Sequence, residues 1–320
     1  MKKPTVSIVI VNYNGKELLK RALDSAYKSS FKDYEVIVVD NASSDDSSGF
    51  IRKNYPKARI VQNEKNEGYV GINCALKFCN GRYILFLNND IELEKDCVRE
   101  LLGAMKRGGN VGMAAPRLVN FYDKSLKSGG TWVSRAFYSG HIRGIGNEKI
   151  KQIPYMGIGL IDRVVIDMFG YLFDNDYFIY AEDLDLGLRL RLLGLKTVFV
   201  PNAKVYHLHA ATMAKTKEYS RTFLLERNLL MTFFKILSLK SILIYFPYAL
   251  VLRLIAALKD FAGLRPMSAL ARIGALFWIL FNMGKIRKKR KGLQLARRMG
   301  DEFVLEAFSE KYIFKKGFVV

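Results

Sequence analysis

Four polar segments carry the side chains best suited to chemistry in the first 90 residues. Each follows an apolar run, and they are Asn12-Tyr13-Asn14-Gly15, Asp40-Asn41, residues 63–68 and Asn88-Asn89-Asp90. Their amide and carboxylate oxygens accept hydrogen bonds, and a carboxylate is also a ligand for a hard divalent cation. Turns and helix caps use the same residue types for local reasons, so one such segment alone carries little weight. Four in succession indicate a lined pocket.

A second acidic segment, Glu182-Asp183-Leu184-Asp185, lies much further along the chain. An apolar stripe at helical spacing predicts a helix that begins near Asp183, formed by Leu184, Leu188 and Leu192. Asp185 and Arg189 have the i,i+4 spacing of an ion pair at a helix start or on a helix surface. Asp183, beside Glu182, is the acid that we expect to do chemistry, because a carboxylate can take a proton from a hydroxyl group.

The elements that position these segments alternate between two hydrophobic periods. Continuous apolar runs predict buried strands at 6–11, 35–40, 58–62 and 82–87, and helical spacing predicts helices at 16–29, 45–55 and 69–79. Strands and helices in alternation imply an α/β fold with a parallel sheet covered on both faces. Ligands of such sheets bind beyond the carboxyl ends of the strands, which is where the four polar segments fall.

The totals bound the class of protein. The 320 residues are half hydrophobic, which allows one large domain or two modest ones. The formal net charge of +21 favours an anionic partner, and residues 215–320 alone hold 21 basic and 7 acidic residues. The three cysteines have no C-x-x-C spacing, so we expect reduced thiols in a cytosolic fold. The short apolar run near the N-terminus indicates a first strand rather than an export signal.

Five segments together resemble the family 2 glycosyltransferases of the GT-A fold. In the order and spacing of that family they are VSIVIVNYNG (6–15), VVDNASSDDS (38–47), NEKNEGYVGINCAL (63–76), LFLNND (85–90) and YAEDLDLGLRLRLLG (180–194). The rhamnosyltransferase-like enzymes of surface-polysaccharide synthesis are the most similar subgroup, since they often carry Asn at the start of the metal motif. The resemblance implies a GT-A catalytic domain over residues 1–214.

The resemblance also implies a nucleotide-sugar donor, UDP- or dTDP-linked, held across the first four strands. Tyr13 would stack on the base, unless it is an ordinary half-buried aromatic residue at a strand end. Either Asp40 or Asn41 would accept a hydrogen bond from the pyrimidine N–H. The other donor-binding candidates lie on the same strand ends and the helix between them, and are Asn12, Asn14, Asn66, Gly68, Asn73, Asn88 and Asn89.

LFLNND is similar to the Asp-x-Asp motif with which the family holds Mg²⁺ or Mn²⁺ on the diphosphate. Asp90 suits direct coordination, whereas the neutral Asn88 would touch the ribose or a metal-bound water. His207 is the candidate further ligand, ahead of His209, with a hydrogen-bonded structural role as the alternative. By the same resemblance Asp183, beside Glu182, is the general base of an inverting transfer.

The acceptor is expected to bind between the two acidic sites, along residues 110–160. This stretch is rich in Gly and aromatic residues and contains Trp132, a candidate for stacking on a sugar ring. A flexible surface loop is the alternative interpretation. The resemblance implies a lipid-linked glycan or another cell-envelope precursor as the acceptor. A non-catalytic sugar-nucleotide-binding scaffold is an alternative function, although a pure binder would need no base.

Residues 215–320 read as a basic, apolar helical region for membrane association. Apolar runs at 241–258 and 268–283 contain Arg253 and Arg272, and six of the seven residues 285–291 are basic. Neither run clearly reaches the ~20 apolar residues of a spanning helix. We therefore favour helices that lie peripherally on an anionic cytoplasmic membrane face over an integral hairpin. Nucleic-acid binding is not expected, because no nucleic-acid-binding fold accompanies the basic cluster.

Overall fold

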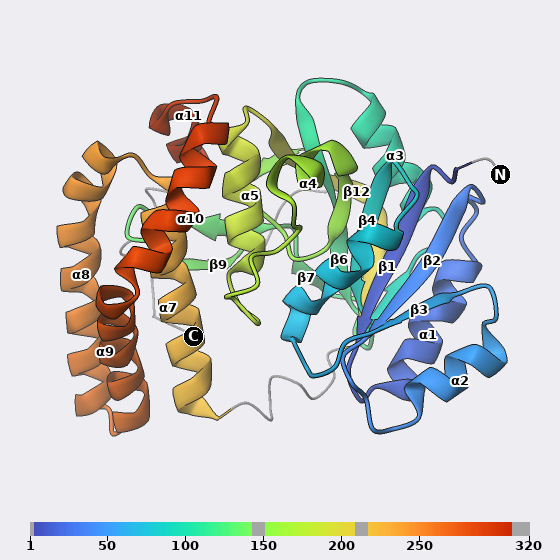
Figure 1. Ribbon diagram of the computed structural model, residues 1–320, viewed down its shortest axis with the longest axis horizontal. Coiled ribbons are helices and arrows are strands. Elements are labelled where there is room, and N and C mark those ends of the chain that lie inside the picture. The colour runs from blue at the N-terminus through green and yellow to red at the C-terminus, as the bar shows by residue number, and fades with distance from the viewer. Residues whose placement is uncertain (1–2, 143–150, 209–216, 309–320) are drawn as a thin grey trace.

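The structure is a computed structural model, and it describes residues 3–142, 151–208 and 217–308. A central β-sheet with helices packed against it forms one side of the molecule, and the helices of the C-terminal third stand side by side at the other (Figure 1). This is the mixed α/β, GT-A-like fold that the alternating periods and the resemblance predicted.

The first half of the sheet is parallel, as predicted. Its strands pair in the order β4-β1-β2-β3, and they are β1 (Val6–Asn12), β2 (Tyr34–Asp40), β3 (Arg59–Gln62) and β4 (Tyr83–Asn88). All seven residues of β1 are buried, which is why this strand reads as a continuous apolar run. Asn12 pairs in register with Asp40, so the carboxyl ends of β1 and β2 meet at one edge.

Three helices connect these strands, and they are α1 (Lys16–Tyr27), α2 (Ser47–Asn54) and η1 (Gly68–Phe78). α1 buries the apolar face that its spacing predicted. η1 is a 3₁₀-helix, a tighter form that rarely runs this long. Apolar spacing predicted a helix here but did not distinguish an α-helix from a 3₁₀-helix.

The second half of the sheet mixes strand directions. Across the whole sheet the order is β10-β12-β6-β11-β4-β1-β2-β3, with β11 antiparallel to both neighbours and β12 parallel to β6. The elements are β5 (Ile91–Leu93), α3 (Cys97–Lys106), β6 (Val111–Asn120), β7 (Leu126–Ser128), β8 (Thr131–Val133), β9 (Ser139–His141), β10 (Lys151–Ile153), β11 (Gly159–Asp162), α4 (Arg163–Phe169), α5 (Glu182–Leu192) and β12 (Lys196–His207). The antiparallel β11 carries the chain from β6 back beside β4.

The C-terminal third is helical. Its described helices are α7 (Glu218–Ile236), α8 (Leu239–Ala262), α9 (Pro266–Phe281), α10 (Met283–Ala296) and α11 (Asp301–Leu305). α7 packs against α5, α9 and α10, and α8 packs against α9. The predicted boundary between residues 214 and 215 lies outside the described residues, so the division into 1–214 and 215–320 stays a prediction.

α8 is longer than the apolar run from which it was predicted. It has 24 residues, continues through Pro247, and contains an 18-residue window of mean hydropathy 2.0. In the described part of the chain it is the one helix long and apolar enough to cross a membrane, unless α9 and α10, bent by 69°, count as a single span. The prediction that neither run reaches spanning length was therefore wrong for α8, because flanking residues extend the helix at both ends.

The two arginines that interrupt the apolar runs point into the protein. Arg253 of α8 and Arg272 of α9 both pair with Glu226 of α7, and Arg272 Nε lies 2.8 Å from Asp260 Oδ2. All four side chains are buried. The outer surfaces of α8 and α9 therefore carry no charge at these two positions.

Candidate functional site

The carboxyl ends of β1, β2 and β4 are joined by one buried amide, that of Asn12. Its Nδ2 donates to Asp40 Oδ1 at 3.2 Å, and its Oδ1 accepts from Asn89 Nδ2 at 2.7 Å. The position needs a donor and an acceptor on the same side chain, which Asn provides and Asp or Leu does not. Three predicted donor-binding residues, from three strand ends, thus lie together.

Asp40 is held by the turn that follows β2. Its Oδ1 also accepts from Ser43 Oγ at 2.5 Å, and its Oδ2 accepts from the Ser43 N–H at 3.3 Å and from Ser48 Oγ at 3.2 Å. The Ser43 hydroxyl in turn accepts from the Asn14 N–H at 2.9 Å, and this bond connects the loop after β1 to the loop after β2. The small polar residues after the strand therefore satisfy a buried carboxylate.

Asn41 joins β2 to the segment after β3. Its Nδ2 donates to the Gly68 carbonyl at 2.7 Å, and its Oδ1 accepts from Asn63 Nδ2 at 2.7 Å. Gly68 has φ +68°, its N–H donates to Asn66 Oδ1 at 2.9 Å, and a Cβ at this position would lie 2.3 Å from the Phe178 carbonyl oxygen. Only glycine fits there. Asp40 and Asn41 are equally buried, so the choice of base contact stays open.

The remaining donor-side candidates differ in exposure. Tyr13 is 46% exposed, which leaves its ring accessible beside the Asn12 cluster. Asn88 is partly exposed at the end of β4. Asn73 is bonded within the protein, because its Nδ2 donates to the Phe173 carbonyl at 2.6 Å and its Oδ1 accepts from the Leu172 N–H at 3.0 Å. Asn73 thus fastens η1 to the loop that leads into α5.

Asp90 and His207 lie side by side at the end of the sheet. His207 Nε2 is 2.9 Å from Asp90 Oδ2, because β12 brings its last residue next to β5, directly after Asp90. Asp90 Oδ1 is buried and has no hydrogen-bond partner among the described residues. Burying a carboxylate oxygen without a partner is costly, so such an oxygen in a native site needs an explanation.

Glu182 and Asp183 open α5 in an apolar environment. Burial raises the pKa of Asp183 to about 6, although the Leu184 N–H donates to its Oδ1 at 2.8 Å. Burial and the neighbouring charge of Asp183 hold the pKa of Glu182 well above its usual range. Glu182 Oε2 is also buried without a hydrogen-bond partner among the described residues. The helix start therefore carries two adjacent carboxyl groups whose pKa values are both raised.

The phenol of Tyr69 connects the two acidic sites. Its hydroxyl donates to the Gly157 carbonyl at 2.9 Å, and a Cβ on Gly157 would lie 3.2 Å from Asp183 Oδ2. Burial, together with the charges of Glu182, Asp183 and Asp90, holds the pKa of Tyr69 well above its usual range. Asp90 and Asp183, far apart in sequence, thus act on one buried side chain. Sequence reasoning did not single out Tyr69, which lies inside the quoted segment 63–76.

Asp185 is paired with Arg189, but not on the surface. Arg189 Nε lies 2.8 Å from Asp185 Oδ2, and both side chains are fully buried. Lys235 of α7 lies 2.8 Å from the other oxygen of Asp185. The predicted helix-start pair is therefore present, and the prediction of a surface pair was wrong because α7 covers this side of α5.

The acceptor region is only partly described. Trp132 lies half-buried in β8, opposite Gly140 of β9. Residues 143–148 of the Gly-rich stretch and His209, the alternative metal ligand, lie outside the described residues. Their predicted roles stay predictions.

A pocket of about 730 Å³ lies at the opposite edge of the sheet. Its lining includes Thr5, Gly81 and Tyr83, which stand at the amino ends of β1 and β4. None of the predicted site residues lines it. The predicted site is instead the carboxyl edge, where strand ends and the start of α5 converge.

Residues 7–161 match the family described as glycosyl transferase family 2. This segment is therefore similar to a family 2 glycosyltransferase domain. Curated relatives include the UDP-Glc:alpha-D-GlcNAc-diphosphoundecaprenol beta-1,3-glucosyltransferase WfaP of Escherichia coli, which is 40% identical over 27% of this chain and 35% of that protein. The hexosyltransferase Agl10 of low-salt glycan biosynthesis in Haloferax volcanii is 26% identical over 58% of this chain and 61% of its own. The matched segments cover between 16% and 35% of the first three such relatives.

Solved structures share the fold of this chain. A crystal structure of GalNAc-T7 with UDP, GalNAc and Mn²⁺ superposes with a TM-score of 0.60 over 72% of this chain and 48% of that chain, at 17% identity. The mannosyltransferase PcManGT from Pyrobaculum calidifontis, in complex with GDP-Man and Mn²⁺, has a TM-score of 0.54 over 92% of this chain and 86% of its own, also at 17% identity. At such identity the likeness shows the fold alone.

Proposed function

We propose that this chain transfers a sugar from a nucleotide diphosphate sugar to a lipid-linked glycan or another cell-envelope precursor, with inversion at the anomeric carbon. The observation that carries the proposal is the convergence of Asp90 and Asp183 on Tyr69. One acid would serve the leaving group and the other the attacking hydroxyl. Relatives named for diphosphoundecaprenol-linked sugars and for teichuronic acid biosynthesis, in Escherichia coli and Bacillus subtilis, support the acceptor class.

The donor would lie over the Asn12–Asp40–Asn89 cluster, with its base toward the accessible ring of Tyr13. Solved structures of the same fold hold UDP-GlcNAc or GDP-Man, which supports a nucleotide-sugar donor without naming it. The rhamnosyltransferase-like subgroup remains our prediction, and it leaves the donor sugar open, with UDP- and dTDP-linked sugars as the candidates.

The residues present fit a divalent cation, Mg²⁺ or Mn²⁺. The partnerless oxygen of Asp90 and the adjacent imidazole of His207 offer two ligand positions. Among the described residues no group of three or more acidic, His or Cys side chains could hold a metal ion by itself, so diphosphate oxygens would supply further ligands. A bound cation offsets the negative charge that develops on the departing diphosphate. Mn²⁺ in solved structures of this fold supports a divalent metal.

Asp183 would act as the general base. A carboxylate with a pKa near 6 is ionised at neutral pH and is still basic enough to take a proton from an acceptor hydroxyl. Burial and the charge of Asp183 also hold the pKa of Glu182 above its usual range, which disfavours a second negative charge beside the base. Gly157, next to Asp183, leaves room for the acceptor to approach.

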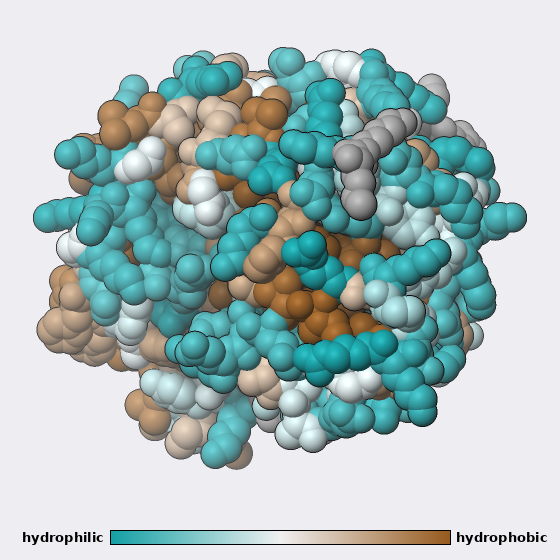
Figure 2. Space-filling model, turned by 45° about the vertical axis from the view of Figure 1, so that its right-hand side comes forward, coloured by the Kyte–Doolittle hydropathy of each residue, from teal (hydrophilic) through white to brown (hydrophobic). Residues whose placement is uncertain are grey.

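The C-terminal helices would place this site at the cytoplasmic face of a membrane. Exposed apolar side chains line α8 and α9, among them Leu243, Leu258, Phe261, Leu270 and Phe281. Figure 2 shows brown and tan side chains at its left edge, on the side where Figure 1 places α8. Residues 239–300 hold thirteen basic residues, all but Arg253 and Arg272 outside the buried set, and one acidic residue, Asp260, which is buried. This surface is complementary to anionic lipid.

Peripheral docking is favoured over a membrane-spanning α8 by one contact. Arg253, near the middle of α8, donates from Nη1 to the Ala136 carbonyl at 2.8 Å and from Nη2 to the Phe137 carbonyl at 3.2 Å. If α8 crossed a bilayer in this packing, the loop at 136–137 would lie at membrane depth. Irregular backbone at that depth would need protein or water around it.

The function is tested by donor binding and transfer. The purified protein is heated with UDP-glucose, UDP-GlcNAc, GDP-mannose or dTDP-rhamnose, each with Mn²⁺, Mg²⁺ or a chelator. We expect one donor to raise the melting temperature, and only when metal is present. At 100–1,000 times its Kd, the bound donor should raise the free energy of unfolding by about 2–4 kcal/mol. Transfer of that sugar to a diphosphate-linked GlcNAc lipid should then be lost in Asp183→Asn, while binding persists. Binding without any transfer by the unmodified protein would instead identify a scaffold.

A further inference from the structure

The loop that leads into α5 has a backbone that its own residues do not favour. Phe178, Tyr180 and Ala181 have φ values of 64°, 72° and 60°, immediately before Glu182 and Asp183. None of the three is glycine, and each such conformation costs about 1–3 kcal/mol unless the surroundings enforce it. Something outside the loop must therefore hold it.

The side chain of Asn228, from α7, holds this loop. Its Nδ2 lies 3.1 Å from the Tyr177 carbonyl, 3.0 Å from the Ile179 carbonyl and 2.7 Å from the Tyr180 carbonyl. Two hydrogens on one nitrogen thus serve three carbonyl oxygens, on both sides of the left-handed residue Phe178. Asn228 is fully buried, so water does not replace these bonds.

The neighbouring residue fixes the orientation of the amide. Asn228 Oδ1 accepts from Arg227 Nε at 2.9 Å and Nη2 at 2.8 Å, and the same guanidinium donates to the Asp176 carbonyl at 2.7 Å. Because Arg227 can only donate, it sets the oxygen toward itself and the NH₂ group toward the loop. The amide of Asn228 therefore has one possible orientation.

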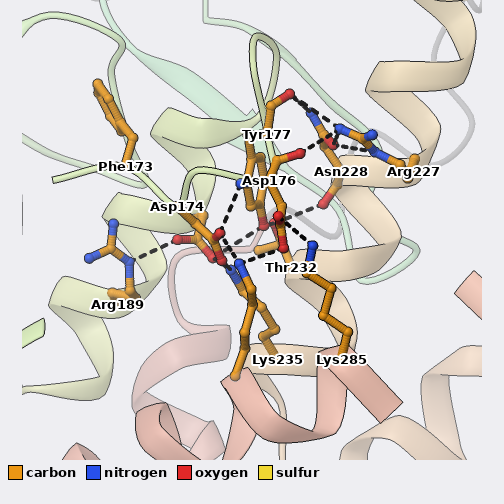
Figure 3. A network of polar contacts seen from close by, with 12 residues as sticks. Phe173, Asp174, Asp176, Tyr177, Arg189, Arg227, Asn228, Thr232, Lys235 and Lys285 are labelled. Carbon is orange, nitrogen blue, oxygen red and sulfur yellow. Dashed lines mark hydrogen bonds and ion pairs between the residues drawn. The ribbon is translucent and has the colours of Figure 1, made fainter. Parts of the chain in front are cut away.

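One face of α7 contacts the whole segment around the start of α5 (Figure 3). Asn228, Thr232 and Lys235 follow the i, i+4, i+7 spacing of a single helix face. Thr232 Oγ1 lies 2.5 Å from the Tyr177 hydroxyl, and Lys235 Nζ lies 2.6 Å from Asp174. Of these contacts only those of Asn228 reach the carbonyls of the left-handed segment itself.

The held loop faces the reacting groups on its other side. The Phe178 carbonyl accepts from the Tyr69 N–H at 2.8 Å, and the Ala181 carbonyl accepts from the Asp185 N–H at 3.0 Å in the first turn of α5. The conformation at 178–181 therefore sets where α5 begins and where the carboxylate of Asp183 points.

We propose that Asn228 is a positioning residue, which holds the 176–181 loop so that Asp183 faces the acceptor hydroxyl. The role of Asp183 rests on the proposed function, whereas the hold on the loop does not. An arrangement of this kind couples the C-terminal helices to the chemistry, since α7 also carries Glu226, to which α8 and α9 are paired.

The test compares Asn228→Ala with Asn282→Ala, a matched control. Asn282 is another amide of the C-terminal helices, partly rather than fully buried, and its Nδ2 donates to the Trp278 carbonyl at 2.9 Å, away from the loop. Backbone hydrogen exchange is measured on the whole protein without ligand. We expect residues 176–185 to exchange at least ~10-fold faster in Asn228→Ala, with the rest of the chain unchanged, because local opening becomes easier. Asn228→Asp keeps the shape of the side chain and the contact with Arg227, but it loses the N–H groups that donate to the loop carbonyls. This variant replaces Asn228→Ala in the test if the alanine variant does not fold.

Kinetics with the donor from the binding screen supply the second readout. We expect kcat to fall at least ~10-fold while the donor KM stays within about threefold, because a misdirected base costs rate rather than donor affinity. Exchange at 176–185 that matches Asn282→Ala would overturn the proposal, as would an unchanged kcat. If exchange rises while the unmodified protein transfers no sugar, the proposed function fails and the hold on the loop stands.

Discussion

At the scale of single residues, two unpartnered carboxylate oxygens stand out. Asp90 Oδ1 and Glu182 Oε2 are both buried without hydrogen bonds among the described residues, whereas Asp40 has several. A structural carboxylate is expected to be satisfied by its neighbours, and Asp40 is. Asp90 Oδ1 and Glu182 Oε2 lack such partners in the described part of the chain, and burial together with the charges of both residues raises the pKa of the Tyr69 phenol.

The pH dependence of transfer follows from Asp183. The base works only when ionised, so kcat/KM should rise with unit slope below about pH 6 and level off above it. A pH–rate profile of the free protein checks this. Asp167→Asn, which changes an exposed carboxylate, should leave the profile unchanged. An inflection near pH 4 would mean that Asp183 is solvated during the reaction and would contradict the assignment.

The buried carboxylate of Asp183 should also lower the free energy of unfolding at neutral pH. Its pKa is about 6 in the native protein and 3.8 unfolded, so the native state binds the proton more tightly. Stability is then greatest below the unfolded pKa and is lost as the pH rises through 6. We expect Asp183→Asn to stabilise the protein at pH 8, by at most about 3 kcal/mol. Urea unfolding at pH 8 and pH 4 should show the gain shrink at the lower pH.

At the scale of elements, α7 is the helix on which the second acidic segment depends. Lys235 is fully buried and lies between Asp174 and Asp185, at 2.6 Å and 2.8 Å. The charges of Lys235 and Lys289 lower the pKa of Asp174 against the opposing effect of burial. The loop and the first turn of α5 are thus pinned to α7 by ionic contacts as well as by Asn228 (Figure 3).

Removing the charge of Lys235 should destabilise the whole protein. Lys235→Met leaves two carboxylates buried with one cation fewer, which typically costs about 3–5 kcal/mol. Lys240→Met, which changes an exposed lysine on the next helix, should cost less than about 0.5 kcal/mol. Chemical unfolding of both variants measures the difference. Equal midpoints would show that Lys289 and Arg189 suffice to neutralise the pair.

At the scale of the whole molecule, the basic residues and the exposed apolar residues are concentrated in the same C-terminal helices. The helices after residue 238 hold most of the exposed large apolar side chains as well as the basic cluster of α10. A soluble protein rarely exposes an apolar surface of this extent without a partner. A lipid-linked acceptor and a nucleotide sugar would meet where such a surface rests on a membrane.

Membrane binding is predicted to need this surface. The protein should sediment with vesicles containing phosphatidylglycerol and bind less as salt is raised, because each basic residue contributes about 1 kcal/mol at an anionic surface. The double change of Leu258 and Phe261 to Glu should weaken binding more than ~10-fold. Tyr122→Glu, which alters an exposed aromatic residue of the sheet domain, is the control. Resistance of cell-membrane fractions to alkaline extraction would favour the integral hairpin instead.

Sequence by itself determined the elements and the edge of the sheet at which the polar residues gather. It could do so because buried parallel strands are continuous apolar runs, and because all carboxyl ends of such strands face one way. It also identified Asp90 and Asp183 as candidate site residues, because a carboxylate at the end of a strand or at the start of a helix can be recognised from the neighbouring residues alone.

Tertiary structure alone decided which neighbours these residues have. The antiparallel β11, the pairing of His207 with Asp90, the burial of Asp185 and Arg253, and the hold of Asn228 on the α5 loop all join segments far apart in the chain. No local period encodes such contacts, because burial and hydrogen-bond partners depend on which surfaces pack together. Polar residues that sequence reads as solvated or as interruptions can therefore turn out to be the ones that fix the site.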